Sequence, residues 1–148
     1  LPRDQARLTS MAAPDPRTVA VVAAGGVVGS LGRYAAGLAL PHAPGTFPWA
    51  TFLVNVSGSL AMGLLVAWLV THPGAHHLAR PFVGVGVLGG WTTFSTLAVD
   101  TVRLGDGHEQ LALLYVAATF VVGILAVGLG ILIGRRTWPD IAGAQEDS

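Results

Sequence analysis

Four long runs of apolar residues follow one another along the chain, and short segments rich in proline and charge separate them. The runs cover residues 18–40, 49–71, 81–104 and 111–134. A helix needs about 20 consecutive apolar residues to cross the hydrocarbon core of a bilayer. The pattern therefore predicts an all-α membrane protein with four transmembrane helices.

The two ends of the chain have a different character. Residues 1–17 combine arginine, aspartate and proline, which predicts a disordered N-terminal tail, and residues 137–148 read as a short acidic C-terminal tail. Residues 18–136 are then expected to form one membrane domain. Leu1 is not a usual initiator, so we expect either a processed chain or a start at Met11.

Composition supports the membrane class and excludes several functions. Of the 148 residues, 52% are hydrophobic and only 11% are charged, whereas soluble domains carry about 25% charged residues. The net charge is zero, so no basic surface for nucleic acid is expected. The absence of cysteine rules out disulfides and thiolate chemistry. The histidines lie in loops or at the edges of the runs, so neither a zinc site nor an enzyme is expected.

The distribution of the arginines predicts which side of the membrane the termini occupy. An even number of spans places both termini on one side, and that side carries more arginines than the other. Cytoplasmic loops are enriched in arginine, so we expect the termini in the cytoplasm and the protein in the inner cell membrane. The arginines of that side are Arg3, Arg7, Arg17, Arg80, Arg135 and Arg136, against Arg103 and Arg33.

The third run has an unusual centre, which reads Gly89-Gly90-Trp91-Thr92-Thr93-Phe94-Ser95-Thr96. Adjacent glycines and several hydroxyl residues predict that this helix is broken at its centre. Irregular backbone survives at that depth only when it is packed in protein or lines a wet cavity, and such breaks bind ions. The alternative is a continuous glycine-rich helix whose hydroxyls bond to their own backbone.

A few polar side chains lie within the other runs. Asn55, the only amide there, either bridges helices or lines a path. Ser59 and Met62 follow Asn55 at helical spacing, one and two turns on. Arg33 either extends to the interface or provides a fixed charge in a vestibule. Phe94 either packs or offers the electropositive edge of its ring to an anion.

Three motifs occur in order on the first three runs, and together they resemble the small four-span fluoride channels of bacteria, the CrcB/Fluc family. The motifs are Gly29-Ser30-Leu31-Gly32-Arg33-Tyr34, then Asn55-Val56-Ser57-Gly58-Ser59 with Gly63, and the run from Gly89 to Thr96. The resemblance covers about residues 19–134. It implies an antiparallel dimer, with a sodium ion buried at the dimer centre and two anion paths.

The resemblance also implies roles for single residues. The backbone carbonyls of Gly89 and Thr92 would bind the sodium ion, and Arg33 would draw fluoride into a vestibule. The implied fluoride pore is lined by Asn55, Phe94, Ser95, Thr96, Tyr115 and Thr119.

Some positions depart from the pattern of the family. Leu97 stands where a second pore phenylalanine is usual, and Gly123 where the fourth span commonly carries a hydroxyl. Ala98 replaces a serine and Asp100 a glutamate. One explanation is that a second, related subunit supplies the missing groups, so the dimer is expected to be either a homodimer or a heterodimer.

Passive export of fluoride is the function that the resemblance implies. Hydrogen fluoride crosses membranes as a neutral acid and ionises inside, and the trapped anion then needs a channel. A proton-coupled exporter is the first alternative, with Asp100 at the edge of the third run as its one candidate carboxylate. A membrane scaffold without transport is the second alternative.

Overall fold

The computed structural model describes residues 15–72, 74 and 77–138. Every regular element in these residues is helical, and four helical segments are long and apolar enough to cross a membrane. The segments are Pro16–Ala39 (α2), Trp49–Thr71 (α3), Arg80–Gly105 and Glu109–Thr137 (α6). The predicted all-α fold with four membrane-length helices is therefore confirmed. The rest of both predicted tails, residues 1–14 and 139–148, lies outside the described residues.

Two helices are longer than the apolar runs that predicted them. The first begins at Pro16 rather than at residue 18, because Asp15 caps it by accepting a hydrogen bond from the Arg17 N–H. The fourth extends to Glu109 at its start and past Arg135 at its end. An acidic first turn and a basic last turn complement the helix dipole, so these polar residues continue the helix.

The third segment consists of three pieces. Arg80–Leu88 (η1) is wound as a π-helix, Gly89–Trp91 (α4) continues it, and Phe94–Gly105 (α5) follows. Thr92 and Thr93 between α4 and α5 are extended, with φ/ψ of −70°/155° and −149°/120°. The third helix is thus interrupted near its middle, within the motif from Gly89 to Thr96.

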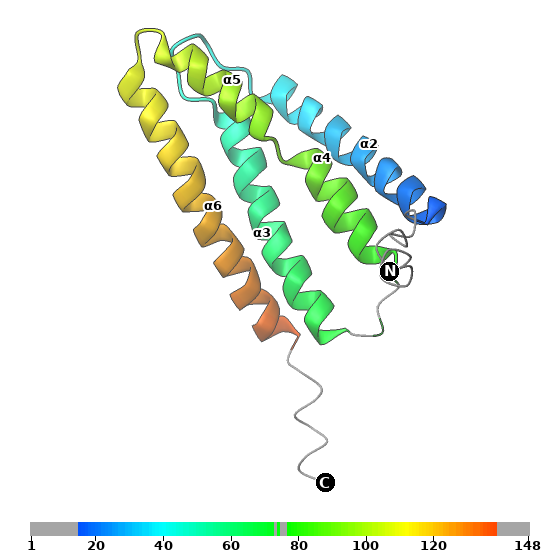
Figure 1. Ribbon diagram of the computed structural model, residues 1–148. Helices are drawn as coiled ribbons and strands as arrows, with labels where there is room; N and C mark the ends of the chain where they lie inside the picture. The colour runs from blue at the N-terminus through cyan, green and yellow to red at the C-terminus, as the bar shows by residue number, and fades with distance from the viewer. Residues whose placement is uncertain (1–14, 73, 75–76, 139–148) are drawn as a thin grey trace, which may run out of the picture.

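The break lets the two halves of this segment pack on different neighbours (Figure 1). The first half, η1 with α4, lies along α2, and the second half, α5, packs on α6. The other main contact joins α3 to α6. Glycines bring these helices close: a Cβ on Gly25 would meet the backbone at Phe82 and Gly86, and one on Gly63 would overlap the Val127 carbonyl.

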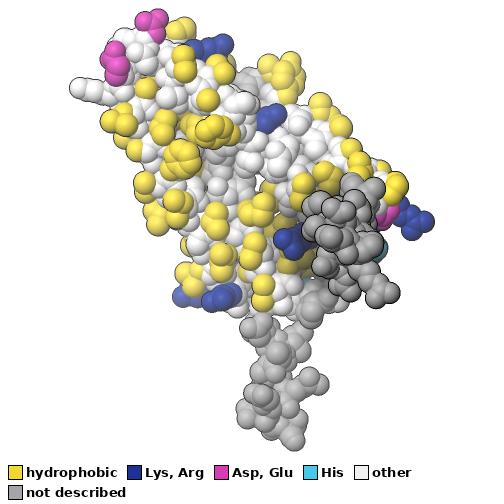
Figure 2. Space-filling view, in the orientation of Figure 1, with side chains coloured by type: hydrophobic (Ala, Val, Ile, Leu, Met, Phe, Trp, Pro, Cys, Tyr) yellow, Lys and Arg dark blue, Asp and Glu magenta, His cyan; other side chains and the backbone are white. Residues whose placement is uncertain are grey.

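Most of the side chains on the outside of the bundle are apolar. Many large ones are more than half exposed, including Leu31 and Leu38 on α2 and Leu113 and Ile124 on α6. Figure 2 shows such side chains spread over the visible face of the molecule. A soluble protein rarely exposes so much apolar surface, whereas lipid solvates it. The chain is therefore a multi-pass membrane protein.

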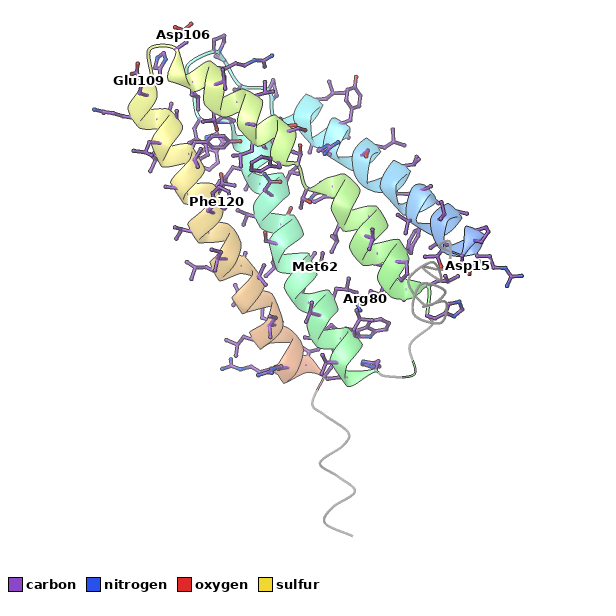
Figure 3. All side chains as sticks on the ribbon, viewed as in Figure 1. Asp15, Met62, Arg80, Asp106, Glu109 and Phe120 are labelled. Carbon is purple, nitrogen blue, oxygen red and sulfur yellow. The ribbon has the colours of Figure 1, made fainter. Side chains whose placement is uncertain are left out.

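Apart from Arg33 and the buried Asp100, the charged residues that the structure describes lie toward the two ends of the bundle. Asp106 and Glu109 occupy the turn between α5 and α6 (Figure 3). Arg17, Arg80, Arg135 and Arg136 lie at the opposite end, where α2 and η1 begin and α6 ends. This separation leaves the interior of the bundle to uncharged residues and to Arg33 and Asp100.

Candidate functional site

The extended residues Thr92 and Thr93 create the site by interrupting the helical hydrogen bonds. Thr93 begins α5 as its cap, with its Oγ1 accepting a hydrogen bond from the Thr96 N–H at 3.1 Å. Thr92 ends the preceding half, where its N–H and its hydroxyl both bond to the Leu88 carbonyl. A threonine therefore satisfies backbone groups on each side of the break: Thr92 bonds to the end of the first half, and Thr93 caps the start of α5.

Asn55 on α3 satisfies the backbone that the break leaves open. Its Oδ1 accepts a hydrogen bond from the Thr93 N–H at 2.8 Å, and its Nδ2 donates to the Thr93 carbonyl at 3.1 Å. Unpaired backbone groups are costly at membrane depth, so this pair is what makes the break tolerable. One Nδ2 hydrogen remains, because an amide carries two donor hydrogens and only one is used.

The interruption leaves the last carbonyl oxygens of the first half without their helical donors, and those of Gly89 and Thr92 are among them. The Thr93 N–H, which would close the turn to Gly89 in a continuous helix, donates to Asn55 instead. The Thr92 carbonyl accepts a hydrogen bond from Arg33 Nη1 at 3.1 Å. A carbonyl oxygen has a second lone pair, and both oxygens lie at the C-terminal, negative end of a half-helix. Neutral oxygens of this kind fit a hard monovalent cation such as sodium.

A groove of about 460 Å³ runs beside the break, lined by α3, by both halves of the third helix and by α6. Its wall contains Asn55, Thr93, Phe94 and Thr119 together with apolar side chains of α6. Phe94 is 74% exposed, so its ring stands free at the edge of the groove. Three of the predicted pore residues, Asn55, Phe94 and Thr119, therefore line one surface, and Gly89 and Thr92 of the predicted cation site line it too.

The remaining predicted pore residues lie elsewhere. The hydroxyls of Ser95 and Thr96 gather around that of Thr93, at 3.2 and 3.0 Å. Thr96 faces a second cavity of about 380 Å³ on the α2 side, which Arg33 also lines. This cavity places Arg33 within the bundle, in a pocket that it shares with hydroxyl groups, while its guanidinium holds the Thr92 carbonyl.

Tyr115 lies outside both cavities and is completely buried. Its hydroxyl donates to Asp100 Oδ2 at 3.4 Å, and Thr51 donates to the same oxygen at 2.8 Å. The ring of Phe47 meets the Tyr115 ring edge-on at 5.3 Å. The sequence placed Asp100 at the edge of its span, but only 4% of it is exposed. This cluster ties α3, α5 and α6 together on one side of the break.

No functional role was predicted from the sequence for two side chains that the structure places in the groove wall. Phe120 of α6 contributes a second aromatic ring, and Ser59 of α3 faces Gly123 across the groove. Figure 3 labels Met62 and Phe120 on α3 and α6, two of the helices that form this wall. The helical spacing of Asn55, Ser59 and Met62 was the available signal, and the structure places all three in the wall.

Comparison with known proteins identifies the family. The family model described as "CrcB-like protein, Camphor Resistance (CrcB)" matches residues 20–131, which include α3, the break and the groove. The chain belongs to the CrcB-like family. The match covers all the residues of the site described above, so the resemblance noted from the three motifs is confirmed.

Several proteins named as fluoride-specific ion channels are similar to this chain. "Fluoride-specific ion channel FluC 2" of Streptomyces avermitilis is 54% identical over 102 residues, 68% of this chain and 65% of the relative. "Fluoride-specific ion channel FluC 3" of the same organism is 48% identical over 79% of this chain and 58% of the relative. "Fluoride-specific ion channel FluC 1" of Streptomyces coelicolor is 48% identical over 80% of this chain and 77% of the relative. The chain thus spans less than two thirds of the first two relatives.

Proposed function

We propose that this CrcB-like chain is a subunit of a fluoride-selective channel, which lets fluoride leave the cytoplasm passively across the inner cell membrane. The observation that carries the proposal is the groove beside the break, where Asn55 and several hydroxyl residues, Thr93 among them, bring polar groups into a largely apolar wall. The names of the relatives point to the same ion. Because a CrcB-like channel moves an ion without chemical conversion, no catalytic residue is assigned.

The groove offers three features that suit a small dehydrated anion. Asn55 retains an N–H donor, and the first turn of α5 directs its backbone N–H groups and positive dipole end toward the break. Phe94 presents a free ring whose edge is electropositive. These groups are neutral, so they compensate lost hydration without binding the anion too tightly for it to leave.

In this proposal the channel is an antiparallel dimer, and a sodium ion binds between the two subunits. Gly89 and Thr92 of each subunit would supply carbonyl oxygens, for which their release from the helix is the support. A sodium ion bound by these oxygens would link the broken third helix of one subunit to that of the other. The second subunit is either an identical chain or a related one. The arginines at the end with Arg80 and Arg135 favour that end in the cytoplasm, and a single preferred orientation fits a related partner that inserts the opposite way.

A proton-coupled exporter remains the alternative with one specific observation in its favour, the buried carboxylate of Asp100. That carboxylate lines neither the groove nor the Arg33 cavity, and hydroxyls of Thr51 and Tyr115 already bond to it. The Asp100 carboxylate therefore serves to hold the helices together, and it does not line a cavity through which a proton or solute could pass. If the protein were a scaffold without transport, the polar residues of the groove wall would have no function.

Reconstitution into liposomes tests the proposal. Protein-containing vesicles loaded with potassium fluoride are diluted into fluoride-free buffer, and valinomycin balances the charge while an electrode records fluoride. We expect rapid fluoride release and no release of chloride from matched vesicles. Release that requires an opposing proton gradient would favour the exporter, and no release with either anion would favour the scaffold.

A further inference from the structure

The hydroxyl groups of the groove differ in whether their hydrogen is already used. Thr92 donates to the Leu88 carbonyl at 2.9 Å, and Thr119 donates to the Tyr115 carbonyl at 2.7 Å. Thr93 donates to Thr96 Oγ1 at 3.0 Å. A hydroxyl has only one hydrogen to donate, so these three can accept further bonds but cannot donate to an anion.

Ser59 is the exception in this wall. Its hydroxyl makes no hydrogen bond with any of the residues that the structure describes, although a serine in a membrane helix ordinarily bonds to the carbonyl four residues earlier. Its oxygen is also not sealed away from the groove, since every fully buried side-chain oxygen in the described residues has a partner. Ser59 therefore presents a free O–H donor to the groove.

Gly123 on α6 opens the space in front of this hydroxyl. A Cβ at position 123 would lie 3.4 Å from Ser59 Oγ, which is ordinary van der Waals contact. Without a side chain there, the room beside Ser59 belongs to the groove. Ser59 also follows Asn55 by one turn of α3, so the two free donors of the wall stand on the same face of one helix.

We propose that Ser59 is an anion-binding residue of the groove, and that its hydroxyl donates to the dehydrated anion one turn beyond the Asn55 amide. The inference rests on the proposed channel function and adds a residue to it. A bare anion at this depth needs donors, and Ser59 and Asn55 are the side chains of the described groove wall that have one left. Ser59 thereby supplies from α3 the hydroxyl that α6 lacks at Gly123.

Removing the hydroxyl tests the inference. Ser59→Ala deletes one oxygen with little change of shape, and we expect fluoride flux in liposomes to fall at least about tenfold, a change of about 1.4 kcal/mol in the barrier. Ser59→Cys keeps a weak donor and should give an intermediate flux. The control is Thr71→Val, which removes a hydroxyl at the far end of α3 whose hydrogen bonds, among the described residues, are to its own helix turn and to His72. Its flux should equal that of the unmodified protein.

A second-site variant separates binding from packing. Gly123→Ser in the Ser59→Ala background returns a hydroxyl from the opposite wall, where the deleted oxygen leaves room. We expect this double variant to recover most of the flux, with thermal unfolding unchanged throughout the series.

Each result bears on one of the two proposals. Flux in Ser59→Ala equal to that of the unmodified protein overturns the role of Ser59 and leaves the channel function intact. Reduced flux that Gly123→Ser does not restore, together with lower thermal stability, also overturns it, because Ser59 would then act in packing. An unmodified protein that conducts no fluoride overturns the channel function itself.

Discussion

Asn55 and the backbone of Thr93 form a closed pair of hydrogen bonds, N–H to Oδ1 at 2.8 Å and Nδ2 to carbonyl at 3.1 Å. The pair resembles the contact between two β-strands, with a side-chain amide in place of one peptide group. It joins α3 to the extended residue at which the third helix is interrupted. Asn55 thus combines the two roles that the sequence left open, since it bridges helices and lies in the groove wall.

Replacing this amide should affect both stability and transport. Asn55→Leu leaves the N–H and the carbonyl of Thr93 without partners, and each unsatisfied buried group costs about 1–3 kcal/mol. We expect a lower thermal unfolding temperature together with loss of fluoride flux. The matched control is Val70→Leu, an exposed position on the same helix, which should change neither quantity. Full stability of Asn55→Leu would show that the break does not depend on the pair.

Arg33 should weaken cation binding at the break, because its guanidinium already bonds to the Thr92 carbonyl. A positive charge beside a cation ligand repels the cation, and this repulsion is strong where the surroundings exclude water. Arg33→Gln keeps a donor for the carbonyl and removes the charge. We expect sodium to protect this variant from thermal unfolding at an at least about threefold lower concentration than it needs for the unmodified protein.

The control for Arg33 is Arg103→Gln, since Arg103 is exposed near the end of α5. Its sodium dependence should match that of the unmodified protein. If Arg33→Gln instead needs more sodium, the guanidinium serves mainly to orient the carbonyl. Protection that is equal with sodium and potassium in every variant would contradict a specific sodium site.

The glycines between α3 and α6 make a third prediction, on packing. A Cβ on Gly63 would overlap the Val127 carbonyl, whereas a Cβ on Gly128 of α6 would meet nothing within 4 Å. We expect Gly63→Ala to destabilise the bundle by about 1–3 kcal/mol, as overpacking does. Gly128→Ala should stay within about 0.5 kcal/mol of the unmodified protein. Unfolding of both variants in detergent measures the difference, and equal stability would mean that the two helices do not approach closely at Gly63.

The sequence was sufficient for the spans and for the position of the break. Hydropathy sets the length of a membrane helix, and two adjacent glycines with two threonines close behind them at mid-membrane depth favoured an interruption over a continuous helix. The sequence was not sufficient for Tyr115. Its burial against Asp100 depends on how α6 is rotated about its axis, and α6 between its charged end turns is apolar on every side, so it gives no periodic signal for that rotation. The spacing on α3 placed Ser59 on the same face as Asn55, but that its hydroxyl is free and lies beside Gly123 follows only from the packed structure.

Phe94 and Leu97 lie one turn apart on α5 and both contribute to the groove, but they differ in burial. Phe94 is 74% exposed, while Leu97 is 5% exposed and packs in a cluster with Tyr115 and Leu104. Phe94→Ile therefore removes a ring edge without disturbing the core. We expect fluoride flux to fall at least about tenfold, equivalent to about 1.4 kcal/mol on the barrier, with thermal stability unchanged.

Leu97→Phe tests whether a second aromatic ring at position 97 fits beside Phe94 and raises the flux. A phenylalanine at position 97 would restore the second ring that the family usually has, yet Tyr115 and Leu104 already fill the space around this side chain. Adding bulk to a filled core costs about 1–3 kcal/mol, so we expect lower thermal stability and no gain in flux. Phe120 already offers a second ring from α6, which removes the need for one at 97. Flux through Phe94→Ile equal to that of the unmodified protein would place the anion path away from this ring, and enhanced flux with full stability in Leu97→Phe would show that the cluster can open.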